Sequence, residues 1–438
     1  MNSLSTIRVG LLGCGNVGGA VVQLLGENGE AVATRSGLRF EVARVAVHNT
    51  AKERAVEFAP GVLTSDAESV VNDPSIDVIV EVMGGVEPAR RLILAALEAK
   101  KPVVSANKEL LANAGPELFV AARRSGVDLL FEAAVAGGIP IIRPLRESLA
   151  GDRLRRIMGI VNGTTNFVLT RMAEDGESFQ EALAEAQSLG YAERDPTADV
   201  EGYDAAAKAA ILASVAFGAE VAAGDVYREG ISGITTEDMA MAHRLGFAVK
   251  LLALIEAFDG DGLSGEAPAE LAVRVHPAMV PLDHPLAAVR DSFNAVFVEG
   301  EAVGELMFYG RGAGGRPTAS AVLGDLIDAG VNLRQGRATH ATVQGRARMR
   351  PIDELRSQYY VSIDVVDRPG VAEKLFGVTA RHGVSIWKME QLGLGDEARL
   401  VLVTHTTTER AMQETLHDFR ELDVVDRVGT LLRVVGPE

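Results

Sequence analysis

The chain has 438 residues, and a single hydrophobic core stops growing near ~250–300 residues, so two or three domains are expected. Lys and Arg total 43 against 60 Asp and Glu, and the net charge of −17 argues against nucleic acid or an anionic membrane as the main partner. The single cysteine, Cys14, excludes disulfides and cysteine-built zinc sites, and no stretch approaches the ~20 apolar residues of a membrane span, so we expect a cytoplasmic protein.

The first third of the chain alternates short apolar runs with helical patterns, which is typical of βαβ units around a parallel sheet. Predicted strands cover residues 7–12, 40–47, 78–82, 103–105 and 129–132. Predicted helices between them cover residues 17–25, 88–99 and 117–124. This order predicts an α/β fold with a Rossmann-type, doubly wound domain over residues 1–140.

A glycine-rich turn follows the first predicted strand and opens the first predicted helix, with the sequence Gly13-Cys-Gly15-Asn16-Val17-Gly18. In such a motif the first glycine permits the turn, the second lets the backbone approach a pyrophosphate, and the third lets the helix pack on the strand. The helix N-terminus faces the anion. We therefore predict dinucleotide binding here, with a tight turn that binds no ligand as the alternative.

The end of the second predicted strand bears on the choice between NAD and NADP. An acidic residue there normally bonds the ribose 2′-hydroxyl, but no carboxylate stands at this strand end. His48, Lys52 and Arg54 could accept a 2′-phosphate, which favours NADP and leaves NAD open. In the alternative, Lys52 and Arg54 are solvated helix residues.

Cys14 lies inside the phosphate-facing turn, away from the reacting end of a nicotinamide. An aldehyde-oxidising enzyme that works through a thiohemiacetal would need another cysteine. The chemistry that remains is hydride transfer between an alcohol and a carbonyl, with a proton donor other than a zinc-bound water.

From about residue 150 the pattern changes to a mixed α+β domain, which we place at residues 141–316. Its predicted helices cover residues 166–172, 179–189, 203–217 and 237–245, and its strands lie near 250–258, 271–275, 294–298 and 303–308. His276 and the three prolines that follow it predict a turn-rich surface loop at residues 276–285. A glycine-rich turn at 310–315 then leads into a helix at 317–330 that we expect to complete the first domain.

One segment of the middle domain places several acids ahead of a lysine; these residues are Glu193, Asp195, Asp199, Glu201, Asp204 and Lys208. Asp204 and Lys208 share one helix face, which by itself indicates a surface ion pair. The helix around Lys208 is apolar almost all round, however, so it should be buried. A buried lysine can give a proton to a developing alkoxide and take it back in the reverse reaction.

Three further motifs carry weaker signals. Lys108 follows a predicted strand at the edge where α/β sheets bind ligands, with a solvated helix-start lysine as the alternative. Glu132 precedes a glycine-rich turn whose carbonyls suit a hard cation, although a plain connection is the default interpretation. The sequence Asn162-Gly-Thr-Thr-Asn166 is first a helix cap and second a place for a carboxylate.

Residues 331–352 contain five arginines and no acid, which predicts a solvated linker, with docking on an acidic surface as the alternative. Residues 353–438 follow the order strand (359–366), helix (371–382), strand (384–390), strand (400–405), helix (409–419) and strand (427–435). This βαββαβ order predicts a ferredoxin-like unit, which we expect to be a separate regulatory module.

Taken together, these motifs resemble homoserine dehydrogenase, in the long form that carries a C-terminal ACT domain. The resemblance covers essentially the whole chain and is most specific in residues 190–208, 162–166, 105–108 and 312–320. It implies reversible reduction of L-aspartate 4-semialdehyde to L-homoserine with NADPH or NADH, on the route to threonine, methionine and isoleucine.

The resemblance also implies roles for single residues. Lys208 matches the proton donor and acceptor, with Lys108 and Asp204 as further catalytic residues. Substrate contacts fall on Glu193, Asp199, Asp204, Gly163 and Thr164. Cofactor contacts fall on Gly13, Gly15, Asn16, Val17, Gly18, Ser105, Lys108 and Gly312. A monovalent cation of the sodium type falls on Glu132, Val135, Gly137 and Ile139.

The C-terminal unit carries Val366-Asp-Arg-Pro-Gly-Val371 at its first strand–helix turn, similar to the ligand-binding turn of ACT domains. The resemblance implies L-threonine as a feedback inhibitor bound between two copies, in a homo-oligomer that is a dimer or a tetramer. Two other interpretations stay open: a non-catalytic sensor of a dinucleotide and an amino acid, and another carbonyl reductase on the same fold.

Overall fold

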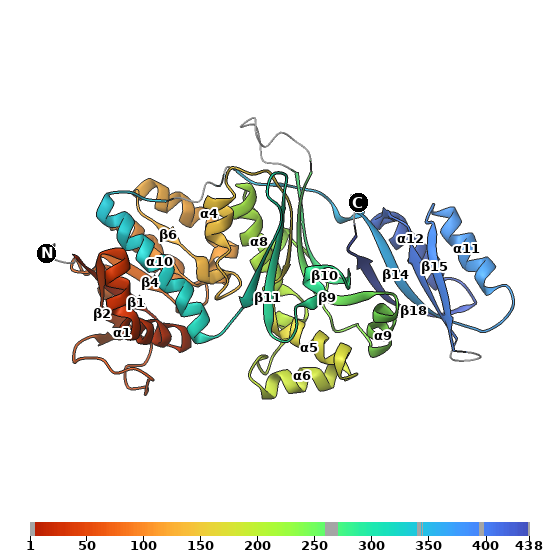
Figure 1. The fold of residues 1–438 in the computed structure, drawn as a ribbon, viewed down its shortest axis with the longest axis horizontal. Coiled ribbons are helices and arrows are strands. Elements are labelled where there is room, and N and C mark those ends of the chain that lie inside the picture. Colours follow the sequence, from red (N-terminus) through yellow and green to blue (C-terminus); the bar gives the residue numbers. More distant parts are fainter. Residues whose placement is uncertain (1–4, 259–269, 340–342, 344, 394–397, 437–438) are drawn as a thin grey trace.

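The computed structural model describes residues 5–258, 270–339, 343, 345–393 and 398–436. Figure 1 shows an elongated arrangement, with a first sheet and its helices at one end, a second sheet in the centre and the C-terminal unit at the other end. No helix among the described residues is long and apolar enough to cross a membrane.

The first sheet is parallel and confirms the predicted Rossmann-like fold. Its strands stand in the order β3 (Leu63–Thr64), β2 (Leu38–Ala46), β1 (Ser5–Leu12), β4 (Val78–Glu81), β5 (Val103–Ser105) and β6 (Leu129–Leu130). The order reverses between β1 and β4, and ligands of such sheets bind at the carboxyl ends of the strands beside this point. The last strand is shorter than predicted, because Glu132 already belongs to a 3₁₀ turn at Glu132–Ala134.

Helices cover both faces of the first sheet, so its strands are apolar on both sides. On one face α1 (Asn16–Ser36) and α10 (Gly315–Gln335) lie side by side (Figure 1). On the other face lie α2 (Ala67–Val71), α3 (Ala89–Glu98) and α4 (Lys108–Ser125). A β-carbon on Gly315 would lie 2.9 Å from the carbonyl oxygen of Asn16, so a glycine is needed where these two helices begin. The late segment α10 therefore packs on the first sheet, where its N-terminus adjoins that of α1.

The second sheet is antiparallel in its central part. Its strands stand in the order β12 (Gly304–Arg311), β11 (Phe293–Gly300), β7 (Leu154–Ile160), β9 (Phe247–Phe258) and β10 (Glu270–Pro281). Its helices are α5 (Gly163–Glu174), α6 (Phe179–Ser188), α7 (Thr197–Val200), α8 (Tyr203–Phe217) and α9 (Thr236–Arg244). Strand β7 was not among the predicted strands, although it leads directly into the Asn162 cap.

The surface loop predicted at residues 276–285 is wrong in its first half. His276 and Pro277 lie inside β10, and His276 is only 1% exposed. On the side away from β9, strand β10 pairs with the short β8 (Tyr227–Arg228) up to Val275 and with another strand from Ala278 onward. Pro277 therefore lies between the two partner strands on that side. Its missing N–H breaks no hydrogen bond of either ladder there.

The C-terminal unit has the predicted element order. Its main elements are β14 (Arg356–Val365), α11 (Val371–Arg381), β15 (Ile386–Leu392), β16 (Arg399–Thr404), α12 (Glu409–Arg420) and β18 (Val425–Val434). The strands form an antiparallel sheet in the order β18-β14-β16-β15, and the short β17 (Thr407–Thr408) pairs with β14. Strand β18 also pairs in parallel with β10 through Ala278 and Met279. The unit has a hydrophobic core of its own, and its sheet also joins the central sheet along β18.

Most arginine side chains of the linker are exposed to solvent, as predicted, and the end of the segment also contacts the middle domain. Arg346 forms an ion pair with Asp225 at 2.6 Å. Arg348 and Arg350 approach Glu270 at 3.7 and 3.8 Å, and the short β13 (Arg348–Met349) pairs with β10. The segment therefore combines the predicted solvent exposure with contacts to acidic residues of the middle domain.

Candidate active site

Two lysines from different halves of the molecule meet at one carboxylate. Lys208, on α8, donates hydrogen bonds to Oδ2 of Asp204 at 2.7 Å and to the carbonyl oxygen of Val161 at 2.7 Å. Lys108, the first residue of α4, donates to Oδ1 of the same Asp204. The three residues that the sequence analysis named as catalytic therefore lie together, where the first sheet's helices face α8.

The surroundings of the two lysines differ. The side chain of Lys208 is 10% exposed and that of Asp204 is 5% exposed, because α8 is covered almost all round, as its apolar sequence predicted. The side chain of Lys108 is 48% exposed. One lysine is therefore desolvated, and the other keeps contact with the solvent.

These surroundings move the two lysine pKa values in opposite directions. Burial lowers the pKa of Lys208, and the negative charge of Asp204 offsets this only in part. Burial also opposes the charged form of Lys108, but the charges of Asp204, Asp199 and Glu193 outweigh it and raise the pKa of Lys108. Burial likewise opposes the ionised form of Asp204, yet the two lysines hold its pKa well below the usual range. Of the two lysines, Lys208 is therefore the one whose pKa is shifted toward neutral pH.

Asn162 connects the acids of this cluster. Its Nδ2 donates to Oδ1 of Asp199 at 2.7 Å and to Oδ2 of Asp204 at 2.9 Å. Its Oδ1 accepts from the backbone N–H of Thr165 at 2.9 Å, so the predicted cap of α5 is present. The sequence predicted the cap and, as a second possibility, a place for a substrate carboxylate, but nothing in its spacing reveals that the Asn162 amide faces two carboxylates of the chain itself.

The N-terminus of α5 opens toward the same cluster. Asn162 satisfies the N–H of Thr165, and no residue of the described chain accepts a hydrogen bond from the N–H of Gly163 or Thr164. The hydroxyl of Thr164 donates to the carbonyl oxygen of Tyr191 at 2.7 Å. The backbone N–H groups rather than this hydroxyl are therefore left for an anion.

The glycine-rich turn has the geometry that its motif predicts. Gly13 has φ +97°, and a β-carbon there would lie 2.7 Å from the carbonyl oxygen of Val82. A β-carbon on Gly18 would collide with the carbonyl oxygen of Gly13, whereas one on Gly15 would meet nothing within 4 Å. Two of the glycines are thus required by the fold, and Gly15 leaves open space at the helix N-terminus. Asn16 and Val17 begin α1 beside that space.

Ser105 does not offer its hydroxyl to a ligand. The residue is fully buried, and the hydroxyl donates to Oε2 of Glu81 at 2.7 Å. Glu81, at the end of β4, also accepts from Nδ2 of Asn107 at 3.4 Å, and Asn107 caps the helix that Lys108 begins. Burial raises the pKa of Glu81. Glu81, which the sequence analysis did not single out, therefore anchors the segment that presents Lys108.

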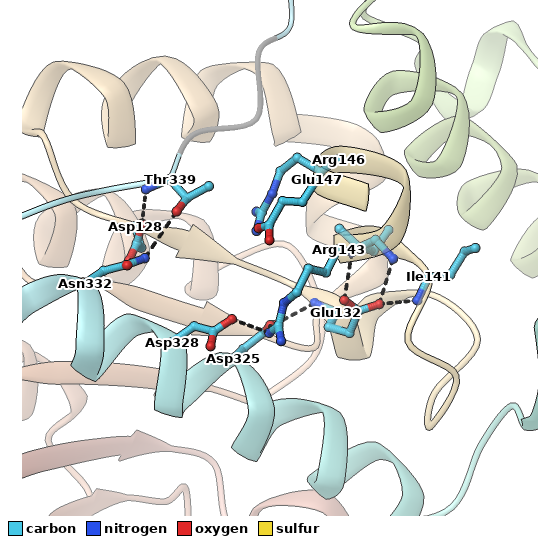
Figure 2. Close-up of polar contacts among 11 residues, drawn as sticks. Asp128, Glu132, Ile141, Arg143, Arg146, Glu147, Asp325, Asp328, Asn332 and Thr339 are labelled. Atoms are coloured by element: carbon cyan, nitrogen blue, oxygen red, sulfur yellow. Dashed lines mark hydrogen bonds and ion pairs between the residues drawn. The ribbon is translucent and has the colours of Figure 1, made fainter. Parts of the chain in front are cut away.

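The carboxylate of Glu132 is held by backbone N–H groups (Figure 2). Its Oε1 accepts from Ile141 and Ile142 at 2.5 and 2.7 Å, and its Oε2 accepts from Arg143 at 2.9 Å. These residues lead into the π-helical turn Pro144–Ser148. The backbone N–H of Glu132 donates in turn to Oδ2 of Asp325 at 2.7 Å.

The turn that follows Glu132 leaves several carbonyls open. No described residue donates a hydrogen bond to the carbonyl oxygen of Val135, Gly137 or Ile139, although all three residues are buried or nearly so. A carboxylate has about four lone-pair positions, so Glu132 retains one beyond its amide contacts. A β-carbon on Gly137 would collide with the carbonyl of Gly312, which places this turn against the predicted cofactor contact. Within the described residues no three His, Cys, Asp or Glu side chains form a metal cluster.

The loop after β2 lies near the glycine-rich turn and contains no helix over residues 48–60, so the helical alternative for Lys52 and Arg54 is wrong. Arg54 donates to the carbonyl oxygen of Lys52 at 2.5 Å. Burial raises the pKa of the Cys14 thiol, although the nearby charge of Arg54 opposes this. A raised thiol pKa reduces the fraction of thiolate at neutral pH.

Comparisons with known proteins cover nearly the whole chain. The family model described as "Homoserine dehydrogenase" matches residues 140–327, and the one described as "Homoserine dehydrogenase, NAD binding domain" matches residues 13–132. A homoserine dehydrogenase of Mycobacterium tuberculosis is 49% identical over an alignment of 437 positions that covers 98% of each chain. The crystal structure of a homoserine dehydrogenase from Thiobacillus denitrificans matches with a TM-score of 0.91 and 40% identity over 98% of each chain. A hyperthermophilic archaeal homoserine dehydrogenase mutant in complex with NADPH matches with a TM-score of 0.61 and 28% identity, over 75% of this chain and 98% of that one.

Proposed function

We propose that Lys208 is the proton donor and acceptor of this chain, which belongs to the homoserine dehydrogenase family. The members of this family are NAD(P)-dependent oxidoreductases that act on a CH–OH group. The substrates are then L-homoserine and L-aspartate 4-semialdehyde, on the route to threonine, methionine and isoleucine. The observation that carries the proposal is the hydrogen-bonded series Lys108, Asp204 and Lys208.

A bound nicotinamide supplies the hydride in one direction and accepts it in the other. When the aldehyde is reduced, negative charge develops on its oxygen, and the ammonium group of Lys208 gives that oxygen a proton. Two of its three N–H bonds point to Val161 and Asp204, which leaves the third for the substrate. Burial lowers the pKa of Lys208 and so eases the loss of this proton.

Lys108 has a different task in this proposal. Its raised pKa keeps it charged, and a fixed positive charge beside the reacting oxygen stabilises a developing alkoxide. Asp204 keeps both lysines in place through its two oxygens. The acid–base role therefore goes to the desolvated lysine and the electrostatic role to the more exposed one.

The acids and amides around this series fit an amino-acid substrate. Asp199 and Glu193 lie close enough to Lys108 for their charges to act on its pKa, and they are the groups we assign to the substrate ammonium. The open N–H groups of Gly163 and Thr164 are assigned to its carboxylate.

For the cofactor we propose NADP, with NAD also accepted. The open space at Gly15 suits a pyrophosphate, and the adjoining start of α10 brings Gly312 toward the same region. His48, Lys52 and Arg54 lie in the loop after β2, where a 2′-phosphate would bind. The contact of Ser105 with the cofactor, if made, uses its backbone, since its hydroxyl is bonded to Glu81.

The open carbonyls of Val135, Gly137 and Ile139, with the remaining lone pair of Glu132, fit a hard monovalent cation such as sodium. Such an ion would fix the turn against Gly312 and takes no part in the proton transfer. We also assign L-threonine, as a feedback inhibitor, to the turn at residues 366–371 in a homo-oligomer. The βαββαβ order of the C-terminal unit supports that assignment.

The test follows the absorbance of the reduced nicotinamide when the chain oxidises L-homoserine with NADP and with NAD. We expect turnover with both cofactors and a much lower kcat/KM for 4-hydroxybutyrate, the analogue without the ammonium group. Equal kcat/KM for the two alcohols would contradict the acidic contacts and favour a carbonyl reductase of other specificity. No oxidation of either alcohol would refute the proposed activity.

A further inference from the structure

A cavity lies between the central sheet and the C-terminal unit, and neither Lys108 nor Lys208 lines it. Its volume is about 300 Å³, which is within the range of small-molecule sites. One wall comes from β9 and β10, and the other from the start of β14 and the end of β18. None of the residues assigned above to the substrate, the cofactor or the cation lines it.

Arginines are the most frequent charged residues in the wall of the cavity. Two glutamates line it, Glu256 and Glu354, together with five arginines: Arg156, Arg274, Arg350, Arg356 and Arg433. Three of the arginines are already paired: Arg274 with Glu256 at 2.6 Å, Arg156 with Glu299 at 2.6 Å, and Arg433 with Glu229 and Glu409 at 2.8 Å. The positive charge that remains for an anionic occupant is that of Arg350 and Arg356.

Two of these arginines have hydrogen-bonding capacity to spare. Among the described residues Arg356 has no ion-pair partner within 4.0 Å. The Nε of Arg350 is buried without an acceptor, and its closest carboxylate, Glu270, is 3.8 Å away. Guanidinium groups of this kind bind carboxylates well.

His276 adds an acceptor that has no partner. The side chain is buried in β10, and its Nδ1 lies 2.9 Å from the carbonyl oxygen of Pro277, so Nδ1 carries the proton. Burial and the charges of Arg433 and Arg274 lower the pKa of His276, so the ring is neutral. Its Nε2 is then a lone-pair acceptor, and no described residue donates to it. A buried acceptor without a donor is unfavourable, and a ligand that donates to it would remove this cost.

The rest of the wall is apolar, with Leu254, Phe258, Leu355 and Val434 among its residues. Such a wall suits the carbon skeleton of an organic molecule better than a bare inorganic ion. We propose that this cavity binds a small organic carboxylate carrying a hydroxyl or amino group, with the carboxylate on the arginines and the donor on Nε2 of His276. This site is independent of the proposed activity and differs from the turn at residues 366–371.

Calorimetric titration of the full chain tests the proposal with three probes: L-malate, L-threonine and inorganic phosphate. We expect at least one carboxylate to bind with one site per chain, and Arg356→Gln to weaken it by tenfold or more. His276→Phe, which keeps a ring and removes the acceptor, should weaken it similarly. Arg410→Gln is the matched control, because Arg410 is exposed on α12 and does not line the cavity.

Three results would overturn the proposal. The first is that neither carboxylate binds. The second is that both carboxylates bind to Arg356→Gln with the affinity of the parent. The third is that phosphate binds to the same site as tightly as the carboxylates. If threonine binding is lost in Arg368→Gln but kept in Arg356→Gln, threonine binds at the turn at residues 366–371. The binding of malate to the parent and to Arg356→Gln then tests the cavity. Since Arg356 is exposed, its variant should fold even where His276→Phe does not.

Discussion

Lys108 and Asp204 lie 96 positions apart in the chain, and the ammonium group of Lys108 donates a hydrogen bond to Oδ1 of Asp204. One partner begins a helix of the first sheet and the other lies in the first turn of α8. The candidate active site therefore exists only when the two halves of the molecule are docked.

Loss of the buried lysine should remove chemistry and spare cofactor binding. We expect Lys208→Ala to lower kcat by on the order of 10²–10⁴-fold, the usual contribution of a positioned acid. The dissociation constant of NADP, measured by fluorescence titration, should stay within about twofold, because the glycine-rich turn is untouched. Lys388→Ala, in the exposed part of β15, is the control. Turnover close to that of the parent would contradict the role of Lys208.

Removal of the shared carboxylate should shift the pH profile. Asp204→Asn takes the counter-charge from Lys208, so the pKa of this buried lysine should fall further. Homoserine oxidation needs the neutral amine, so the acid limb of its kcat profile should move to lower pH. The same profile is measured for Asp195→Asn, an exposed carboxylate nearby. An unshifted limb in Asp204→Asn would show that this limb does not report Lys208.

Two glycines of the same turn should respond differently to alanine. A methyl group on Gly15 meets nothing, so Gly15→Ala should fold with unchanged stability and bind NADP at least about tenfold more weakly. A methyl group on Gly18 collides with the backbone of Gly13, so Gly18→Ala should also lower the melting temperature. Thermal unfolding and NADP titration of both variants check this. Tight NADP binding by Gly15→Ala would contradict the pyrophosphate assignment.

A buried arginine ties the C-terminal unit to the middle domain. Arg433 bonds both Glu229 and Glu409 at 2.8 Å and is 2% exposed. Arg433→Met leaves the buried Glu409 without its cation and should lower the free energy of unfolding by about 3–5 kcal/mol. Urea unfolding measures this, with Arg427→Met on the same strand as the exposed control. A loss equal to that of the control would mean that the network contributes little.

The carboxyl beside Glu132 should make stability depend on pH. Burial, with a smaller contribution from the charge of Glu132, raises the pKa of Asp325 to about 7. An unfolded Asp titrates near pH ~3.9, so the native chain holds an extra proton between these values. The stability that this group contributes is therefore present below about pH 4 and is lost as the pH rises through about 7.

Asp325→Asn removes this titration and keeps an oxygen that can accept from the N–H of Glu132. Its free energy of unfolding relative to the parent should rise by up to about 4 kcal/mol between pH 4 and 8, as urea unfolding at several pH values would show. The exposed Asp353→Asn serves as the control. Parallel pH curves for Asp325→Asn and the parent would contradict the shifted pKa.

Local patterns predicted much of the molecule because each depended on neighbours in sequence. The glycine-rich turn, the cap at Asn162 and the burial of α8 follow from short-range chemistry. The features that these local patterns did not predict depend on contacts between residues far apart in the sequence. The bond from Ser105 to Glu81 and the partner change at Pro277 are of this kind, as is the pairing of β10 with β18.

Because β18 pairs with β10, the C-terminal unit cannot be removed without changing the central sheet. Cutting the chain near residue 352 would strip the partner from Ala278 and Met279 and leave an apolar strand edge open to other molecules. A shortened chain that loses its response to an effector would then report a damaged sheet as well as a missing receptor. Point changes on the exposed side of the unit are the sounder way to separate sensing from folding.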